Sequence, residues 1–275
     1  MSKIVIRFTI FAALMISAIC VNAQTSPSND TDDPDFIVPA RPTVSNPAEF
    51  QKPGVLQLEF GYNGNFRSSE FKSQDDAPLA LRFAVNRRLL VELDTDSPFS
   101  QKDSSNFRQT GAGDTQLGIQ GVLQTENESR PGVALAYYIK LPTASREKNL
   151  GTGRVDHSFI GLVSKKIDKT TIDFNAIYLL AGRTSRKGFA SSGQGALAVS
   201  QEITKKFGIQ SEISGSSRSD EQSGAMFGLG VVTYQINKRI VLDSGARFGL
   251  TSNAPRFGIV VGITVGVANL YKKSN

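Results

Sequence analysis

Apolar residues occupy every second position in a series of short segments that fill the last four fifths of the chain. Within residues 239–250, for example, Ile240 and Leu242 stand at even positions together with other apolar residues. Asp243 and Arg247 stand at odd positions. Neighbouring residues of a strand point to opposite faces, so this alternation predicts strands with one apolar face and one polar or small face.

Twelve segments carry the alternation, and most are near the length of about 9 to 11 residues with which a tilted strand crosses a bilayer. The predicted strands are Val55–Phe66, Leu79–Asn86, Leu89–Asp96, Thr115–Gln124, Val133–Leu141, Val155–Lys165, Thr170–Ala181, Gly195–Glu202, Lys206–Ser214, Ala225–Ile236, Arg239–Leu250 and Arg256–Leu270. After the first 23 residues, no stretch reaches the roughly 18 continuous apolar residues that a membrane-spanning helix needs.

The connections between these segments alternate between short and long. Tight linkers are expected at 86–88, 167–169, 203–205 and 237–239, and long ones at 67–78, 97–113, 142–154, 183–193 and 215–224. Bacterial outer-membrane barrels have short periplasmic turns and longer extracellular loops. The sequence therefore predicts an all-β fold, an antiparallel transmembrane β-barrel of about twelve strands over residues 53–275. The connections 125–132 and 251–255 fit the alternation less well.

The polar parity of the strands predicts the inner face of the barrel. Charges of both signs occur there, and opposed charges in a narrow pore act on a solute together with its width. The expected pore-lining residues are Arg82, Glu92, Asp94, Gln116, Gln120, Lys140, Asp173, Asn175, Glu212, Asp243 and Arg247. Glycine on the same parity would relieve crowding on the concave face, at Gly228, Gly230, Gly245, Gly249, Gly258, Gly262 and Gly266.

Residues 1–23 have the plan of a Sec-type signal peptide. Lys3 and Arg7 precede the apolar run 8–21, and small residues stand before Gln24. The alternative, a lipoprotein signal at Cys20, has Ile19 where a small residue is usual. Cys20 is the single cysteine of the chain, so we expect neither a disulfide nor a thiolate metal site in the exported protein.

Residues 24–52 are rich in Pro, Ser, Asn, Thr and Asp and show no period, and they carry two basic against five acidic residues. This composition predicts a largely disordered periplasmic segment that serves as an export spacer. The alternative is a functional tail that plugs the pore or contacts a periplasmic partner.

The charge of the chain is mildly basic, at +6 for all residues. The basic residues stand singly or in pairs at segment ends, without the clusters and interleaved aromatic residues that follow a phosphate backbone. No nucleic-acid partner is therefore expected.

Four short motifs follow each other between residues 111 and 166. They are Gly111–Gly118, Lys140–Thr143, Leu150–Asp156 and Ser164–Lys166. In this order and spacing the chain resembles the outer-membrane transporter family of the phenol meta-cleavage (MetA) degradation pathway. The resemblance implies a barrel of about twelve strands that passes small, often hydrophobic or aromatic, compounds.

The same motifs have plain structural roles near the mouth of a barrel. Glycine permits a sharp passage from loop to strand, and proline ends a ladder because it has no amide to donate. The residues concerned are Gly113, Asp114, Pro142, Thr143, Gly151, Gly153 and Asp156. The alternative is that the loop 142–154 folds inward and gates or lines the mouth.

The last predicted strand resembles the signal that the barrel-assembly machinery reads. Thr264, Gly266 and Tyr271 hold its polar, glycine and final aromatic positions, whereas Asn269 departs from it. Barrel-assembly machinery and outer-membrane lipid are therefore expected partners, together with a small-molecule solute.

Catalytic chemistry is not expected. The single histidine, His157, stands between Asp156 and Ser158, so in a strand it points away from both. Glu92, Asp94 and Asp96 share one parity and could hold a calcium ion, but they are expected to balance basic residues across the lumen. No glycine-rich phosphate loop leads from a strand into a helix, and no cofactor or metal is expected.

The leading functional hypothesis is a passive outer-membrane channel for small solutes. A second hypothesis is a structural or adhesive barrel with a blocked lumen and partner-binding extracellular loops. A third is a secreted soluble β-sandwich, which the same alternation permits.

Overall fold

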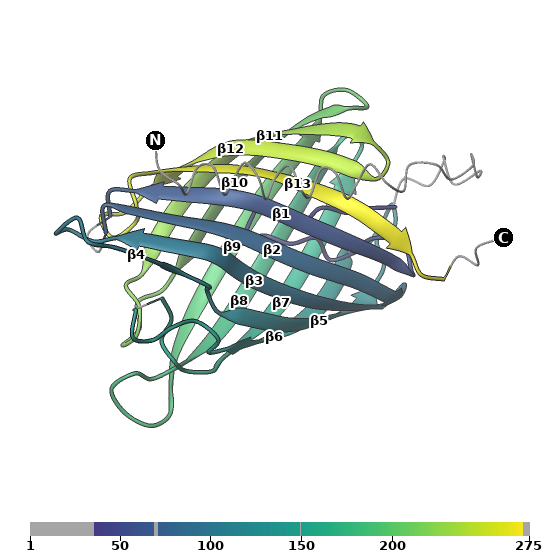
Figure 1. Ribbon diagram of the computed structural model, residues 1–275. Coiled ribbons are helices and arrows are strands. Elements are labelled where there is room, and N and C mark those ends of the chain that lie inside the picture. Colours follow the sequence, from purple (N-terminus) through teal and green to yellow (C-terminus); the bar gives the residue numbers. More distant parts are fainter. Residues whose placement is uncertain (1–35, 69–70, 149, 272–275) are drawn as a thin grey trace. The chain divides into compact units, whose positions relative to one another are not determined.

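The computed structural model describes residues 36–68, 71–148 and 150–271 (Figure 1). The expected signal peptide and residues 24–35 lie outside the described residues. The described part of the chain has no helix that is long and apolar enough to span a membrane. It is built from β-strands, loops and one extended segment that precedes the first strand.

The strands follow one another along the chain from residue 55 to residue 269. They are β1 Val55–Phe66, β2 Ser73–Asn86, β3 Leu89–Lys102, β4 Arg108–Gly111, β5 Thr115–Gln124, β6 Gly132–Leu141, β7 Asp156–Ile167, β8 Thr170–Gly182, β9 Phe189–Glu202, β10 Phe207–Ser216, β11 Ala225–Asn237, β12 Ile240–Gly249 and β13 Phe257–Asn269.

Twelve of these strands close into an antiparallel barrel. Each pairs with its neighbours in the sheet, β1 pairs with β13, and β2 pairs with β3, so the ring has no free edge. Closure satisfies the backbone hydrogen bonds that lipid cannot satisfy. The short β4 pairs with the loop end of β3 at Phe99–Lys102, beyond the point where the β3–β5 ladder ends at Thr95 and Thr115. A closed ring excludes the β-sandwich hypothesis.

The predicted strand positions are confirmed, with differences at the loop ends. β1 and β5 have the expected bounds, whereas β2 begins at Ser73 instead of Leu79 and β9 at Phe189 instead of Gly195. These extensions rise toward the loops, where apolar residues are no longer needed on the outer face. β4 was not expected, because its sequence Arg-Gln-Thr-Gly has no apolar residue.

The apolar parity lies on the outer face of the barrel. Leu135 and Ile119 are more than half exposed, while their strand neighbours Ala134 and Gln120 are buried. Large apolar side chains that stand exposed all around a closed barrel are typical of a lipid-facing surface.

Two predicted inward glycines, Gly228 and Gly230, instead lie on the outer face. Leu229 and Val231 take the inner positions of β11, where they are buried and pack with Val260 of β13. Apolar residues occupy both parities here, so alternation alone could not assign the faces of this strand.

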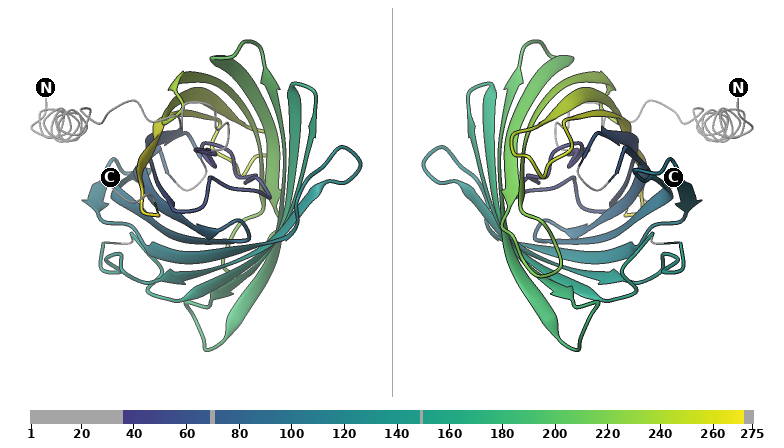
Figure 2. Two further views of the ribbon diagram at one scale, coloured as in Figure 1. Left: turned by 90° about the vertical axis from the view of Figure 1, so that its right-hand side faces the viewer. Right: turned by 90° about the vertical axis from the view of Figure 1, so that its left-hand side faces the viewer.

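The chain before β1 lies inside the barrel, which corrects the expectation of disorder for its described part. Figure 2 shows residues 36–52, here called the lumen segment, within the ring of strands. Phe36, Ala48 and Phe50 are buried there. The composition predicted disorder because a polar segment cannot build a core of its own. Inside the barrel, however, the wall supplies both apolar and hydrogen-bonding partners.

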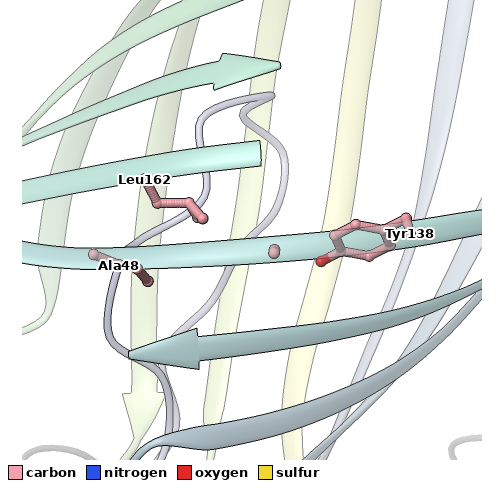
Figure 3. Packing of buried hydrophobic residues seen from close by; sticks show 5 residues of the cluster. Ala48, Tyr138 and Leu162 are labelled. Atoms are coloured by element: carbon pink, nitrogen blue, oxygen red, sulfur yellow. The ribbon is translucent and has the colours of Figure 1, made fainter. Parts of the chain in front are cut away.

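Three small apolar clusters hold the lumen segment to the wall. Ala48 packs with Tyr138 and Leu162 in the cluster that Figure 3 shows. The two other clusters gather Phe50 with Ala84, Leu90 and Val122, and Phe36 with Ile37 and Val55. The segment is thus fixed near its beginning and near its end.

Candidate functional site: the lumen and its cavities

Inner-wall side chains bind the backbone of the lumen segment along much of its length. The Glu59 carboxylate accepts hydrogen bonds from the amides of Ala40 and Arg41, both at 3.0 Å. The Glu212 carboxylate accepts one from the amide of Ser45 at 2.7 Å. These bonds satisfy amides that would otherwise be buried without partners.

The carboxamides and a hydroxyl of the wall continue this pattern. Asn175 accepts from the amide of Asn46 at 2.8 Å and donates to the same residue's carbonyl at 2.9 Å. Gln120 donates to the carbonyls of Pro47 and Ala48, and Ser164 accepts from the amide of Ala48 at 2.8 Å. Asp173 accepts a hydrogen bond from Ser164 at 2.5 Å, which orients that hydroxyl.

Arg82 of β2 is the buried centre of a charge network. Its guanidinium lies 3.1 Å from a Glu59 oxygen and 3.3 Å from a Glu92 oxygen, and it donates to the carbonyl of Val38 at 2.9 Å. The Tyr138 hydroxyl donates to Glu92 at 3.1 Å. Arg82 is fully buried. A buried charge of this kind depends on its partners, because desolvation is costly without them.

Arg41 of the lumen segment binds the wall at β12, which is separated from β2 by β1 and β13. Its guanidinium lies 3.0 Å from the Asp243 carboxylate of β12 and donates to the carbonyl of Val261 at 3.1 Å. It passes over two glycines, Gly61 and Gly262, at which any side chain would collide with it. Arg82 therefore fixes the segment to β2 by a hydrogen bond, and Arg41 fixes it to β12 by an ion pair.

A cavity of about 390 Å³ opens in the lumen on the loop side of the segment. One part of its wall is apolar, with Ile160 of β7 and Ile177 and Leu179 of β8. The rest is mainly polar and consists of Asn46 with Glu92, Asp94, Gln116, Tyr138, Lys140, Asp156, Ser158 and Gln194, and Val44 of the lumen segment completes the lining. The lining carries three carboxylates and one ammonium group, so its formal charge is negative.

A second cavity, of about 290 Å³, lies nearer the loops. Arg247 lines it together with Asn65, Gln74 and Glu221. The guanidinium of Arg247 lies 5.8 Å from the ring centroid of Phe227, which also lines this cavity.

The eleven residues that were expected to line a pore divide into three groups. Gln120, Asp173, Asn175, Glu212 and Asp243 contact or support the lumen segment. Arg82 does so too and pairs with Glu92, which lines the first cavity together with Asp94, Gln116 and Lys140. Arg247 lies apart, at the second cavity.

The motif residues meet at the loop end of β5, β6 and β7. Asp114 accepts a hydrogen bond from the Ala144 amide at 3.0 Å, and the Lys140 ammonium lies 3.3 Å from Asp114 and 2.6 Å from Asp156. Thr143 donates to the carbonyl of Gly113 at 3.3 Å. Pro142 follows the last residue of β6, Gly151 lies close to Asp114, and Gly153 has a positive φ of 66°. These contacts hold the loop 142–154 against the loop end of the barrel.

Several residues of the site were missed from the sequence. Gln57, which donates to the carbonyl of Val38 at 2.9 Å, and Glu59 stand on the polar parity of β1, so the rule that found Arg82 could have found them. Tyr138 was not predicted to line the lumen, because aromatic residues of a barrel strand are more typical of the lipid-facing side. Arg41 lies in the segment that was expected to be disordered.

His157 lies on the outer face, as expected, where its Nδ1 is 2.8 Å from the Tyr137 hydroxyl. Ser158 instead lines the inner cavity, so the two side chains are on opposite sides of the wall. Within the described ranges, no three His, Cys, Asp or Glu residues are gathered as a metal site. The side chain of Asp96 lies outside what the structure describes.

Solved structures with a similar fold are outer-membrane barrels. An outer membrane channel from Pseudomonas putida F1 superimposes with a TM-score of 0.63 at 14% identity, over 79% of this chain and 97% of that chain. The NanC porin superimposes with a TM-score of 0.53 at 10% identity, over 77% of this chain and 98% of that one. These likenesses confirm the fold, a closed antiparallel β-barrel of the kind found in outer-membrane channels and porins.

No curated protein matches the sequence. A family model does match it, over residues 39–265, and that family is described as "Putative MetA-pathway of phenol degradation". The match includes all four motifs and most of the lumen segment, and it confirms the resemblance seen in the sequence. The chain belongs to this family.

Proposed function

We propose that the protein is a passive outer-membrane channel for small solutes with an apolar, in particular aromatic, body. The observation that carries the proposal is the first cavity. Its volume of about 390 Å³ lies within the range of roughly 300 to 1,000 Å³ in which proteins hold small molecules. Its apolar wall suits a ring, and its polar wall offers partners for one or two polar substituents.

The charge of this cavity refines the solute class. Three acidic side chains line it. Glu92 is paired with Arg82, and Asp156 shares the single ammonium of Lys140 with Asp114, so acidic groups outnumber basic ones around the cavity. An anionic solute would meet repulsion there, since charges in a partly dry cavity are weakly screened. Neutral aromatic compounds should therefore pass more readily than aromatic carboxylates.

The lumen segment gives the channel a narrow resting state. It crosses the interior between the first cavity and the turn end, so a solute leaves the cavity past this segment. We propose that the inner-wall residues which bind it, among them Glu59, Arg82 and Asp243, set how far the passage opens. The compound crosses the barrel chemically unchanged, and the residues that bind the lumen segment have no catalytic role.

A liposome uptake assay tests the proposal. Purified protein is reconstituted, and the uptake of a neutral aromatic compound, an aromatic acid and a sugar is compared with that of empty liposomes. Once uptake by protein-free liposomes has been subtracted for each compound, a greater protein-dependent uptake of the neutral aromatic than of the sugar supports the channel. If none of the three enters faster than into empty liposomes, the protein is a structural or adhesive barrel instead.

A further inference from the structure

The turn end of the barrel carries an exposed basic rim, which we define as Arg87, Arg88, Arg130, Lys169, Lys205 and Lys206. These residues lie in four consecutive connections on this side: β2–β3, β5–β6, β7–β8 and β9–β10. All six are exposed. The rim therefore follows the barrel from β2 to β10 and is not confined to one sector.

Carboxylates near the rim are in part already paired with other residues. Glu126 pairs with Lys165 at 3.2 Å, and Glu202 pairs with Lys166 at 2.9 Å. Among the residues that the structure describes, no carboxylate forms an ion pair with the six rim residues. Their positive charge is thus available to an external anion.

Exposed apolar side chains stand beside the rim. Leu89 follows Arg88 directly, Ile167 precedes Lys169 by two residues, and Ile203 and Phe207 flank Lys205 and Lys206. In a membrane interface, an apolar side chain enters the acyl region while a neighbouring basic side chain extends to the phosphate plane. The rim is continuous with the lipid-facing surface described above.

We infer that the basic rim binds the headgroups of anionic phospholipids in the periplasmic leaflet of the outer membrane. Short turns of such barrels face the periplasm, so this end meets that leaflet. Lipid fits better than an acidic protein, because a lipid annulus follows the barrel wall over the whole stretch from β2 to β10 that the rim spans, whereas a folded partner would cover one sector. Each basic residue near an anionic surface should strengthen binding by about fivefold.

The experiment compares lipid association in mixed nanodiscs that contain phosphatidylglycerol and phosphatidylcholine. The rim variant Lys169→Gln/Lys205→Gln/Lys206→Gln is matched by a loop-end control with equal charge loss, Lys148→Gln/Lys187→Gln/Arg218→Gln, whose three positions are exposed. Native mass spectrometry counts the lipids of each class that remain bound. Heat-modifiable migration in gels confirms that all variants are folded.

Wild type and the loop-end control should retain phosphatidylglycerol severalfold over phosphatidylcholine, and the rim variant should lose most of this preference. Inorganic phosphate at the same concentration should not displace the bound lipid. The inference is overturned if wild type shows no preference, if the control loses as much as the rim variant, or if inorganic phosphate competes as well as the lipid does. None of these readouts depends on solute uptake.

Discussion

Gly61 and Gly262 pair directly across the β1–β13 ladder, and the guanidinium of Arg41 occupies the space that their side chains would fill. Glycine at this pair is therefore a requirement of the lumen segment. Asp243, which forms the ion pair with Arg41, stands opposite Gly262 in the neighbouring β12–β13 ladder.

Replacing Gly262 with leucine should expel Arg41 from this position. We expect the lumen segment to detach on this side and single-channel conductance in planar bilayers to rise. Gly230→Leu is the matched control, because Gly230 lies on the outer face and a side chain there meets nothing within 4 Å. An unchanged conductance in folded Gly262→Leu would show that the segment does not limit the pore.

Removing Arg82 should destabilise the barrel strongly. Arg82→Ala leaves Glu59 and Glu92 buried without their cation, and breaking a buried ion pair in this way costs about 3 to 5 kcal/mol. The loss is measured as the change in the free energy of unfolding by urea in lipid vesicles. Lys166→Gln is the control, because its exposed pair with Glu202 should contribute at most about 1 kcal/mol. Equal losses in the two variants would contradict the central role of Arg82.

Filling the first cavity should slow the uptake of aromatic solutes. Ile177→Trp adds bulk to the apolar wall, and we expect uptake of a neutral aromatic compound to fall severalfold in liposomes. The adjacent Tyr178→Trp changes an outward, half-exposed residue and should leave uptake unchanged. If the two variants behave alike, the solute does not pass through this cavity.

The loop that follows β8 and the loop that follows β10 should lose their contact with each other only in strong acid. Asp220 accepts a hydrogen bond from Arg183, and this bond, with the charges of Arg183 and Arg186, holds the pKa of its carboxyl below the ordinary value. A carboxyl with a lowered pKa stabilises the folded form above its unfolded pKa and loses this effect as the pH falls through the lowered value. Hydrogen exchange of residues 217–224, expressed relative to the intrinsic rate at each pH, should therefore stay constant from pH 7 to about pH 5 and rise below the ordinary carboxyl range. In Asp220→Asn it should be fast at neutral pH as well; slow exchange in that variant would contradict the prediction.

The fold was predictable because lipid imposes a simple rule on each strand. β1 and β5 obey it over their full length, so both of their ends were correct. β9 begins six residues before its predicted start, since Phe189–Gln194 lies toward the loops and its composition is no longer set by lipid. On β11, Leu229 and Val231 face inward while Val232 faces outward, and there the rule gave the wrong face for Gly228 and Gly230.

The inner wall and the lumen segment form one interface, and only the residues of the inner wall could be predicted from the sequence. Inward residues such as Asn175 and Glu212 were identified, but as groups that face water in a pore. Their partners are backbone amides of Ser45 and Asn46, and a backbone amide leaves no trace in the sequence. The lumen segment folds only against a wall assembled from strands far along the chain, which composition cannot report.

The site that binds Arg41 of the lumen segment is formed by the first strand and the last two strands of the barrel. Glu59 of β1, Asp243 of β12 and Gly262 of β13 must stand together before Arg41 can bind, and they do so only when β13 has paired with β1. The lumen segment is synthesised before all of the strands, but it is consequently the last to reach its position. Assembly intermediates that still lack the closing seam should leave residues 36–52 open to protease, and protection of that stretch marks the completed ring.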